Sequence, residues 1–244
     1  MGDCGTIVVT GGGRGIGAAI ARRLARDGYA VLLNYTASAD RAEAVAAEIV
    51  ASGGQASICR ADVADAAAVS AMFERVDQAR APLVGLVNNA GILGGSRRID
   101  EHDAGSLQAI LATNVLGPML CAREAVRRMS RSHGGAGGAV VNIGSIAGST
   151  GGIPGLVPYS ASKGAVASFT IALAKEVARE GIRVNAVAPG IVATDMTAGF
   201  AEGVGQLVPA GRCGDPDEIA AAVSWLLSDE ASYVSGTVLN VSGG

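Results

Sequence analysis

Short apolar runs alternate with longer alanine-rich segments along almost the whole chain, and this alternation constrains the fold more than any other feature. Continuous apolar strands joined by crossover helices are typical of a parallel sheet covered on both faces. The chain is therefore predicted to be an α/β protein with a doubly wound parallel sheet. The predicted strands are residues 6–10, 30–35, 55–60, 83–88, 139–145, 182–188 and 238–241. The predicted helices are 15–28, 39–52, 65–80, 103–131, 158–180 and 215–228.

A glycine-rich turn follows the first predicted strand. Residues 11–17 read GGGRGIG, and an alanine-rich segment of helical period continues from them. Glycines let the backbone adopt positive φ and let a phosphate-bearing ligand approach the helix N-terminus, where free N–H groups and the helix dipole favour an anion. Any tight connection between a strand and a helix can use glycines, but this turn opens a β-α-β series and therefore favours a nucleotide cofactor.

Tyr159 and Lys163 lie four residues apart in a segment of helical period. Positions i and i+4 are neighbours on a helix, so an ammonium group is expected beside a phenol. A tyrosine with its ordinary pKa of about 10 is a poor acid or base at neutral pH unless a nearby cation stabilises the phenolate. The pair therefore predicts a proton donor, with a chance meeting on an amphipathic helix as the alternative.

Further polar residues stand where two predicted strands end. The sequence NNAG at residues 88–91 closes the fourth strand, and Ser145 closes the fifth. Ligands of such folds bind beyond the carboxyl ends of the strands, at the same edge as the glycine turn and the start of the Tyr159 helix. The Ser145 hydroxyl is thus placed to hold a carbonyl oxygen, although a buried serine also commonly caps backbone groups.

Composition argues against several other classes of protein. Aromatic residues are only 3% of the 244, too few for a platform that stacks single-stranded nucleic acid, and a net charge of −3 without a long basic run disfavours electrostatic nucleic-acid binding. No apolar leader or membrane span is expected. The scattered cysteines and histidines predict no metal site and favour a reduced, cytoplasmic protein. These residues are Cys4, Cys59, Cys121, Cys213, His102 and His133.

Together these motifs resemble the short-chain dehydrogenase/reductase family, and the likeness covers nearly the whole chain. Residues 10–17 match the family's cofactor turn, residues 88–91 match its NNAG segment, and residues 189–194 match the segment that contacts the nicotinamide end. The resemblance implies one Rossmann-type domain over residues 1–244 with about seven strands, a nicotinamide cofactor and a homotetramer. The residues that match the family's catalytic tetrad are Asn114, Ser145, Tyr159 and Lys163.

The resemblance also implies a role for each tetrad residue. In the reducing direction Tyr159 donates a proton to the oxygen of a carbonyl whose carbon receives hydride, and Ser145 binds that oxygen and stabilises its developing charge. Lys163 lowers the pKa of Tyr159 and holds the nicotinamide ribose. Asn114 anchors a water that links Lys163 to solvent as a proton path.

The end of the second predicted strand bears on the choice between NADP(H) and NAD(H). An acidic residue there would bind the adenosine ribose of NAD and repel a 2′-phosphate, but residues 34–38 read NYTAS. Arg14 could pair with the phosphate, unless it is only a solvated turn residue, so NADP(H) is predicted. The predicted cofactor contacts are Gly11, Gly13, Arg14, Gly15, Ile16, Gly17, Asn34, Tyr35, Thr36, Asp62, Val63, Asn89, Ala90, Gly91, Tyr159, Lys163, Pro189, Gly190, Val192 and Thr194.

The segment 191–211 is expected to form a lid over the substrate. Its sequences TDMT at 194–197 and VPAGR at 208–212 resemble bacterial 3-oxoacyl-[acyl-carrier-protein] reductases, so reduction of an acyl-thioester carbonyl is the first expectation. Four basic residues are candidates to meet an acidic carrier protein, with a solvated helix face as the alternative. They are Arg127, Arg128, Arg131 and Lys175.

Other activities stay open. The loop from Ser145 to Tyr159 is one residue longer than is usual in those reductases, and its sequence GGIPG at 151–155 is similar to glucose-dehydrogenase-like relatives. A sugar or another small alcohol is therefore the alternative substrate. A non-catalytic NADP-sensing protein on the same scaffold is a remote alternative, because loss of tetrad residues would have been its signature and all four are present.

Overall fold

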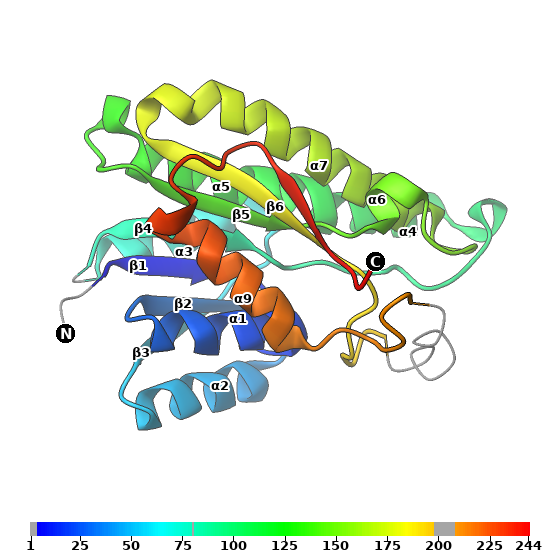
Figure 1. The fold of residues 1–244 in the computed structure, drawn as a ribbon, viewed down its shortest axis with the longest axis horizontal. Helices are drawn as coiled ribbons and strands as arrows, with labels where there is room; N and C mark the ends of the chain where they lie inside the picture. Colours follow the sequence, from blue (N-terminus) through cyan, green and yellow to red (C-terminus); the bar gives the residue numbers. More distant parts are fainter. Residues whose placement is uncertain (1–3, 80, 198–207) are drawn as a thin grey trace.

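The structure is a computed structural model of the 244-residue chain, and it describes residues 4–79, 81–197 and 208–244. It confirms the predicted α/β fold. The described residues form a seven-stranded, wholly parallel sheet in the order β3-β2-β1-β4-β5-β6-β7 (Figure 1). The strands are β1 (Thr6–Val9), β2 (Ala30–Tyr35), β3 (Gln55–Arg60), β4 (Leu83–Asn88), β5 (Gly138–Ile143), β6 (Ile182–Pro189) and β7 (Val238–Val241).

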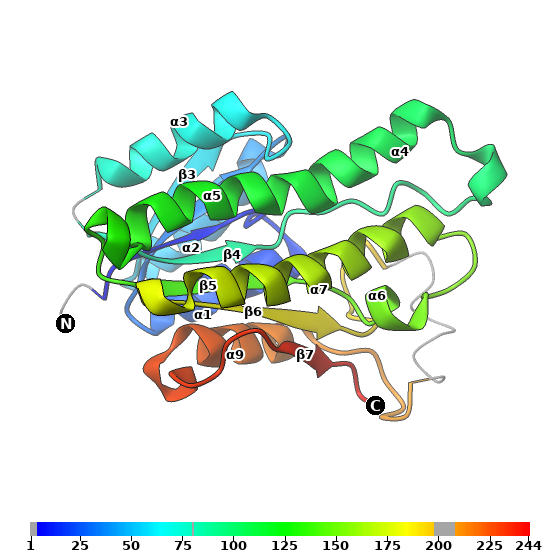
Figure 2. The same ribbon diagram turned by 90° about the horizontal axis from the view of Figure 1, so that it is seen from above.

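Helices cover both faces of this sheet. One face carries α1 (Gly15–Arg26), α2 (Ala39–Ala51) and α9 (Pro216–Leu227). The other carries α3 (Ala66–Asp77), α5 (Gly117–Met129) and α7 (Val157–Val177), which Figure 2 shows side by side. Two shorter helices, α4 (Ala104–Leu111) and α6 (Ala147–Thr150), lie toward the carboxyl ends of the strands. The sheet is therefore doubly wound, as predicted.

The core on each side of the sheet is aliphatic, because the chain has few aromatic residues. Every residue of β1 is buried, as expected for a central strand with a helix layer on both faces. Ile20 and Leu226 are fully buried on the side of α1 and α9, and Phe73 and Met129 are fully buried on the side of α3 and α5. The two layers hold the strands rigidly, so the loops at the carboxyl edge start from fixed positions.

The predicted helix at 103–131 is interrupted. Between α4 and α5 the chain forms one π-helical turn, Ala112–Leu116, with Asn114 buried inside it. A π turn adds a residue to the helix and such turns often occur at functional sites. The apolar periodicity of the sequence predicted the helix but not this irregular turn.

The long helical stretch from Ala104 to Met129 is apolar and long enough to span a membrane by length and composition alone, contrary to expectation. Its most apolar window has a mean hydropathy of 1.3 and is 28% buried inside the structure. In this fold the stretch covers the sheet, where it contacts α3 and α7, and its C-terminal part carries several charged side chains. The same pattern is typical of a covering helix in a globular protein.

Two boundaries differ from prediction in ways that concern the site. β5 ends at Ile143, so Ser145 lies in the connection beyond the strand, where Gly144 N–H bonds to the Val187 carbonyl at 2.7 Å. The connection then turns into α6, a helix that was not predicted. The predicted lid at 191–211 is described at residues 191–197 and 208–211, and its residues 198–207 lie outside the described residues.

Candidate active site

A cavity of about 480 Å³ opens at the carboxyl edge of the sheet. The strand order reverses between β1 and β4, and ligands of doubly wound folds bind in the crevice at such a reversal. The cavity is lined by the glycine turn after β1, by the segments that follow β2, β4, β5 and β6, and by the first turns of α7. A smaller cavity of about 220 Å³ lies at the opposite edge, beside Thr6, Ala30 and Gln55.

The glycine turn requires glycine at specific positions. Gly11 and Gly15 have φ of +63° and +50°, a region that other residues rarely adopt. A Cβ on Gly17 would lie only 2.3 Å from the Gly11 carbonyl oxygen, so the turn can close against α1 only without a side chain there. At Gly11, Gly13 and Gly15 the backbone of the turn therefore lines the cavity without a side chain, and Arg14 and Ile16 of the same turn also line it.

Thr10 and Asn89 fasten the glycine turn to the end of β4. The Thr10 hydroxyl accepts hydrogen bonds from the Asn89 and Ala90 N–H groups at 2.9 and 3.0 Å. The Asn89 side chain donates to the carbonyls of Thr10 and Gly11 at 2.9 and 3.1 Å. The TG and NNAG motifs, 78 residues apart in sequence, therefore form one hydrogen-bonded unit at the floor of the cavity.

Asn34 supports this unit from behind. It is 1% exposed, its amide nitrogen donates to the Ala61 carbonyl at 2.8 Å, and its oxygen accepts from the Gly11 N–H at 3.3 Å. The sequence predicts Asn34 as a cofactor contact, but the structure places it under the turn. Gly17 also lies behind the turn, where its missing side chain lets Gly11 and Asn89 pack closely against it. Both residues shape the turn that faces the cavity.

Tyr159 and Lys163 meet on the first turns of α7, as their spacing predicts. Pro158 stands at the start of this helix, where its missing N–H costs nothing. The Lys163 ammonium lies 5.6 Å from the centre of the Tyr159 ring and donates a 2.8 Å hydrogen bond to the Ile143 carbonyl at the end of β5. Burial lowers the pKa of Lys163 from 10.5 to about 8.

The pKa of Tyr159 moves in the opposite direction from the one expected. Burial raises it above 10.0, and a hydrogen bond with the Ser145 hydroxyl offsets only part of this effect. The Lys163 ammonium lies over the ring and donates its hydrogen bond to the Ile143 carbonyl, not to the phenolic oxygen. The observed geometry thus joins Tyr159 to Ser145 and leaves Lys163 as a buried cation beneath them.

Asn114 connects the π turn to α7 and to the segment after β4. Its oxygen accepts from the Ile92 N–H at 2.8 Å, and its nitrogen donates to the Ile92 carbonyl at 2.9 Å and to the Ser162 hydroxyl at 3.0 Å. A Cβ on Gly91 would lie 3.3 Å from the Asn114 oxygen and 3.6 Å from the Lys163 nitrogen. Asn114 therefore joins the Ile92 backbone to the side chain of Ser162, the residue before Lys163 in α7.

Most predicted site residues line the cavity. Of the four tetrad matches, Ser145, Tyr159 and Lys163 face it, and Asn114 lies in the layer behind. The predicted cofactor contacts in the lining are Gly11, Gly13, Arg14, Gly15, Ile16, Tyr35, Thr36, Asp62, Val63, Asn89, Ala90, Gly91, Tyr159, Lys163, Pro189, Gly190, Val192 and Thr194. The lining also contains Asp195, Met196 and Thr197 of the predicted lid, and it contains residues that sequence reasoning did not name as site residues: Ala37, Ser38, Arg41, Ile92, Thr113, Ile143 and Gly144.

Arg41 is the missed residue with the clearest chemistry. It lies in the first turn of α2, just after residues 34–38, and its charge was the available signal. Its guanidinium pairs with the Asp195 carboxylate, 154 residues later in the chain. The end of the cavity beside Tyr35 and Thr36 therefore carries two arginines, Arg14 and Arg41, and one acid from the segment after β6.

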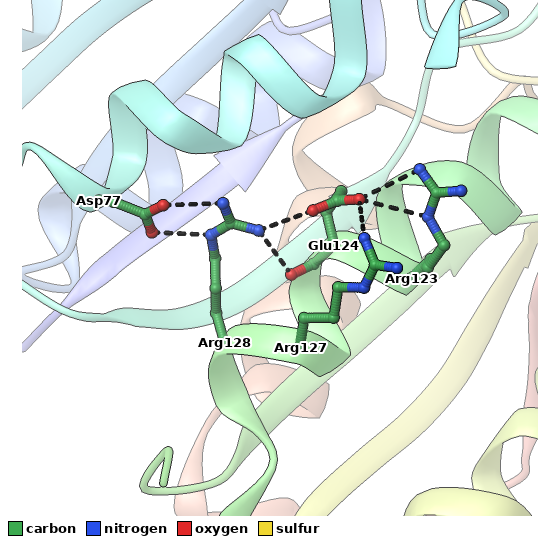
Figure 3. Close-up of polar contacts among 5 residues, drawn as sticks. All are labelled: Asp77, Arg123, Glu124, Arg127 and Arg128. Carbon is green, nitrogen blue, oxygen red and sulfur yellow. Dashed lines mark hydrogen bonds and ion pairs between the residues drawn. The ribbon is translucent and has the colours of Figure 1, made fainter. Parts of the chain in front are cut away.

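A second group of charges lies on α5, at the other end of the fold. Glu124, whose side chain is 4% exposed, pairs with Arg123, Arg127 and Arg128 at 3.1, 2.9 and 2.9 Å (Figure 3). Arg128 also binds Asp77 of α3 through two hydrogen bonds of 2.7 Å. We call these five residues the Glu124 cluster. It is close to the amino end of β5, which is the edge opposite the cavity.

The sequence was compared with protein families and with known proteins. The family model for short chain dehydrogenases matches residues 5–204. An uncharacterized oxidoreductase of Escherichia coli, YgfF, is 45% identical over 242 residues, which are 97% of this chain and 98% of that protein. A 3-oxoacyl-[acyl-carrier-protein] reductase of Synechocystis is 41% identical over 241 residues, which cover 97% of this chain and 95% of the reductase.

Solved structures agree with the sequence comparison. A dehydrogenase/reductase of Sinorhizobium meliloti superposes with a TM-score of 0.93 and 38% identity, over 99% of this chain and 95% of that one. A short chain dehydrogenase of Burkholderia cenocepacia in complex with NADP superposes with a TM-score of 0.91 and 37% identity, over 98% and 96% of the two chains. With the family model, the full-length relatives and the cavity in agreement, this chain belongs to the short-chain dehydrogenase/reductase family and is an oxidoreductase.

Proposed function

We propose that this enzyme is an NADP(H)-dependent ketoreductase that interconverts a carbonyl and a secondary alcohol, with a 3-oxoacyl thioester as the preferred substrate. The observation that carries the proposal is the placement of Tyr159, Ser145 and Lys163 in one cavity with the glycine turn. A dinucleotide fits this cavity because the turn presents side-chain-free backbone at a helix N-terminus. When bound, the nicotinamide supplies or accepts the hydride.

The tetrad residues provide the proton chemistry in this proposal. Ser145 binds the substrate oxygen, and Tyr159, already hydrogen-bonded to Ser145, donates its proton to that oxygen. Lys163 has a pKa of about 8, so at pH 7 it is about nine-tenths protonated. A buried cation beneath the ring then stabilises the phenolate that forms as the proton leaves. Asn114 is proposed to anchor a water that links Lys163 to solvent, which is the route by which the proton is restored.

Preference for NADP(H) follows from the charges at the adenosine side. Tyr35, Thr36 and Ser38 line the cavity after β2, where an NAD-specific site would place a carboxylate. Arg14 and Arg41 line the same region and carry the positive charge that a 2′-phosphate requires. The similarity to a Burkholderia cenocepacia dehydrogenase solved in complex with NADP supports this preference.

The acyl substrate is supported by relatives whose names describe that activity. Reductases for 3-oxoacyl-[acyl-carrier-protein] from Synechocystis and Staphylococcus aureus match almost the full chain at 41% and 39% identity. The basic residues proposed to meet the carrier protein differ in availability. Arg128 is only 18% exposed and is engaged by Glu124 and Asp77, whereas Arg131 and Lys175 are exposed. A carrier would therefore depend on the latter two and on Arg127, which is 60% exposed.

A sugar or small alcohol is the second candidate, and the connection from Ser145 to α7 favours it. Gly152 and Gly155 have positive φ, and the Gly155 carbonyl accepts from the Arg97 N–H at 3.0 Å, which ties this connection to the segment after β4. A connection held in this way has less conformational freedom on the substrate side of the cavity than a loop without such a hydrogen bond. We keep the non-catalytic NADP sensor as a remote third candidate, with turnover as the discriminating measurement.

The assembly proposed is a cytoplasmic homotetramer that binds neither nucleic acid nor a membrane. Exposed apolar residues lie along the two helices on the outer face, which supports contact with further copies. They are Leu111, Leu116 and Met119 on the α4–α5 stretch, and Val157 and Ile171 on α7. Sedimentation equilibrium of the purified protein measures the assembly mass.

A substrate panel tests the proposed reaction. NADPH oxidation is followed with acetoacetyl thioesters, simple ketones and diketones, and reduction of NADP⁺ or NAD⁺ is followed with glucose and secondary alcohols. Fast turnover of the thioester is expected. Turnover of glucose alone would establish the sugar dehydrogenase instead, and no turnover of any compound would favour the sensor.

Tyr159→Phe tests the assigned proton donor. Removal of the phenolic oxygen should lower kcat by about a hundredfold or more, because general acid catalysis contributes about 10²–10⁴-fold. The Kd for NADPH, measured by fluorescence, should change little, since the ring and Lys163 stay in place. A variant that keeps most of its turnover would contradict the assignment.

A further inference from the structure

We propose that Arg41 is the specificity-determining residue for the 2′-phosphate of NADP(H), and that Asp195 holds the Arg41 guanidinium until the phosphate displaces it. This inference rests on the proposed use of NADP(H). The two residues come from distant parts of the chain and act together. Arg41 is the cation that binds the phosphate, and Asp195 is an internal anion that competes with the phosphate for Arg41.

The position of Arg41 places it beside the adenosine ribose. It belongs to the first turn of α2, and the residues that follow the second strand of a doubly wound fold lie next to this ribose. A Cβ on Gly13 would lie 3.2 Å from the Ala42 nitrogen, so the first turn of α2 packs directly on the glycine turn. Arg41 lines the cavity together with Tyr35, Thr36 and Ser38.

Asp195 reaches the same region from the other side of the cavity. Its carboxylate pairs with the Arg41 guanidinium at 2.5 Å, and both side chains are in the lining. The neighbouring residue, Thr194, is fixed against the glycine turn, because a Cβ on Gly15 would lie 3.3 Å from its methyl group. The Thr197 hydroxyl accepts from the Thr194 N–H at 3.1 Å and so holds the turn that presents Asp195.

The charges around Asp195 resemble those that a phosphate needs. Arg41 lowers the pKa of the Asp195 carboxyl, first through its hydrogen bond and then through its charge, and Arg14 adds a smaller effect of the same sign. One carboxylate thus lies in the field of both arginines on the adenosine side. A phosphate at this position would meet the same two cations and would be repelled by Asp195.

Exchange of the two anions is favourable because the existing pair is weak. The Arg41 and Asp195 side chains are 53% and 62% exposed, and ion pairs this open to solvent contribute little to stability. A phosphate monoester carries a charge of about −1.5 to −2 with three acceptor oxygens, and guanidinium binds it through paired hydrogen bonds. The neutral 2′-hydroxyl of NAD(H) offers no such replacement, so Arg41 stays with Asp195 when NAD(H) binds.

The alternative is that the Arg41–Asp195 pair is an ordinary surface ion pair and that Arg14 alone reads the phosphate. The two possibilities differ in what happens when each partner is neutralised. If the anions exchange, loss of Arg41 weakens binding of NADPH, and loss of the Asp195 charge strengthens it. If the pair is only a surface contact, neither change discriminates NADPH from NADH.

The experiment measures Kd values for NADPH and NADH by fluorescence titration, without turnover, for the wild type and for Arg41→Gln, Arg41→Lys and Asp195→Asn. Arg41→Gln should raise the Kd for NADPH by about tenfold or more, as expected for a lost hydrogen bond to a charged group, and leave that for NADH within about twofold. The Kd of Arg41→Lys for NADPH should lie between those of the wild type and Arg41→Gln. Asp195→Asn should lower the Kd for NADPH by about two- to fivefold.

A matched control removes a comparable pair elsewhere. Arg22 and Glu48 form an ion pair with side chains 41% and 58% exposed, and Arg22 is outside the cavity lining. Arg22→Gln removes the same charge and should leave both Kd values unchanged. Unaltered NADH binding by the Arg41 variants shows that they are folded.

Three outcomes separate the inference from the function on which it rests. If wild-type protein binds NADPH no more tightly than NADH, the proposed NADP(H) function fails. If wild type prefers NADPH and Arg41→Gln keeps that preference, the assignment of Arg41 is overturned while the cofactor assignment stands. If Asp195→Asn binds NADPH as wild type does, the displacement of Asp195 is overturned.

Discussion

Two buried charges on neighbouring helices have opposite surroundings. Glu124 on α5 is 3% exposed and is neutralised by three arginines, whereas Lys163 on α7 is 6% exposed and has an aromatic ring and a backbone carbonyl beside it. In the described part of the chain no carboxylate pairs with Lys163. A buried charge with partners is compatible with a structural role, and one without them is costly enough to need another explanation. The difference identifies Lys163 as the functional charge of the two.

The largest expected effect is on turnover. Lys163→Met should lower kcat by about a hundredfold or more, because it removes the cation that stabilises the developing phenolate. Glu124→Gln should leave kcat near the wild-type value, since the Glu124 cluster lies at the opposite edge of the sheet. Steady-state kinetics well below the melting temperature measures both. Equal losses in the two variants would remove the distinction drawn between the two charges.

Stability should show the reverse order. Glu124→Gln leaves Arg128, only 18% exposed, without its charged partner on α5 and should cost about 2–4 kcal/mol of unfolding free energy, somewhat less than for a fully buried pair. Arg123→Gln is the matched control, because Arg123 is 45% exposed and its contact with Glu124 should contribute about 1 kcal/mol or less. Urea denaturation midpoints report both. A smaller loss from Glu124→Gln than from Arg123→Gln would contradict this account.

The two charges should also make stability depend on pH, at opposite ends of the range. Burial raises the pKa of Glu124, but the hydrogen bonds from Arg128 and Arg123 and the charges of Arg127 and Arg128 outweigh it, so the net pKa is lowered from 4.5. The stabilisation that ionised Glu124 provides is complete above pH 4.5 and is lost as the pH falls further. The excess stability of wild type over Glu124→Gln should therefore shrink in acid.

Lys163 should act at alkaline pH. Its pKa is about 8 when folded and 10.5 as the reference value, so between these values the unfolded chain binds more protons and stability rises with pH. Across this pH window the unfolding free energy of the wild type should rise relative to that of Lys163→Met by at most about 3 kcal/mol. Denaturation at pH 7.5 and 10 checks the sign. A constant difference would show that the ammonium is not destabilised by burial.

The sequence predicted elements that depend on local periodicity, and it missed features that depend on tertiary contacts. All seven strands were predicted to within two residues, because buried parallel strands are continuous apolar runs. Tyr159 and Lys163 were predicted to meet because four residues make about one helical turn. The rise in the pKa of Tyr159 depends on burial, which spacing does not encode. The contact of Arg41 with Asp195 spans 154 residues, beyond any local pattern.

The π-helical turn at Ala112–Leu116 has a consequence for how this protein tolerates insertions and deletions. Each residue of an α-helix rotates the chain by roughly 100°, so one extra residue changes the direction in which the side chains after it point relative to those before it. α5 can therefore direct Met129 at the sheet while α4 follows a different phase. Deleting a single residue between Ala112 and Leu116 should convert the π turn into a regular α-helical turn and remove Asn114 from its hydrogen bonds with Ile92 and Ser162, so this turn should tolerate deletions poorly.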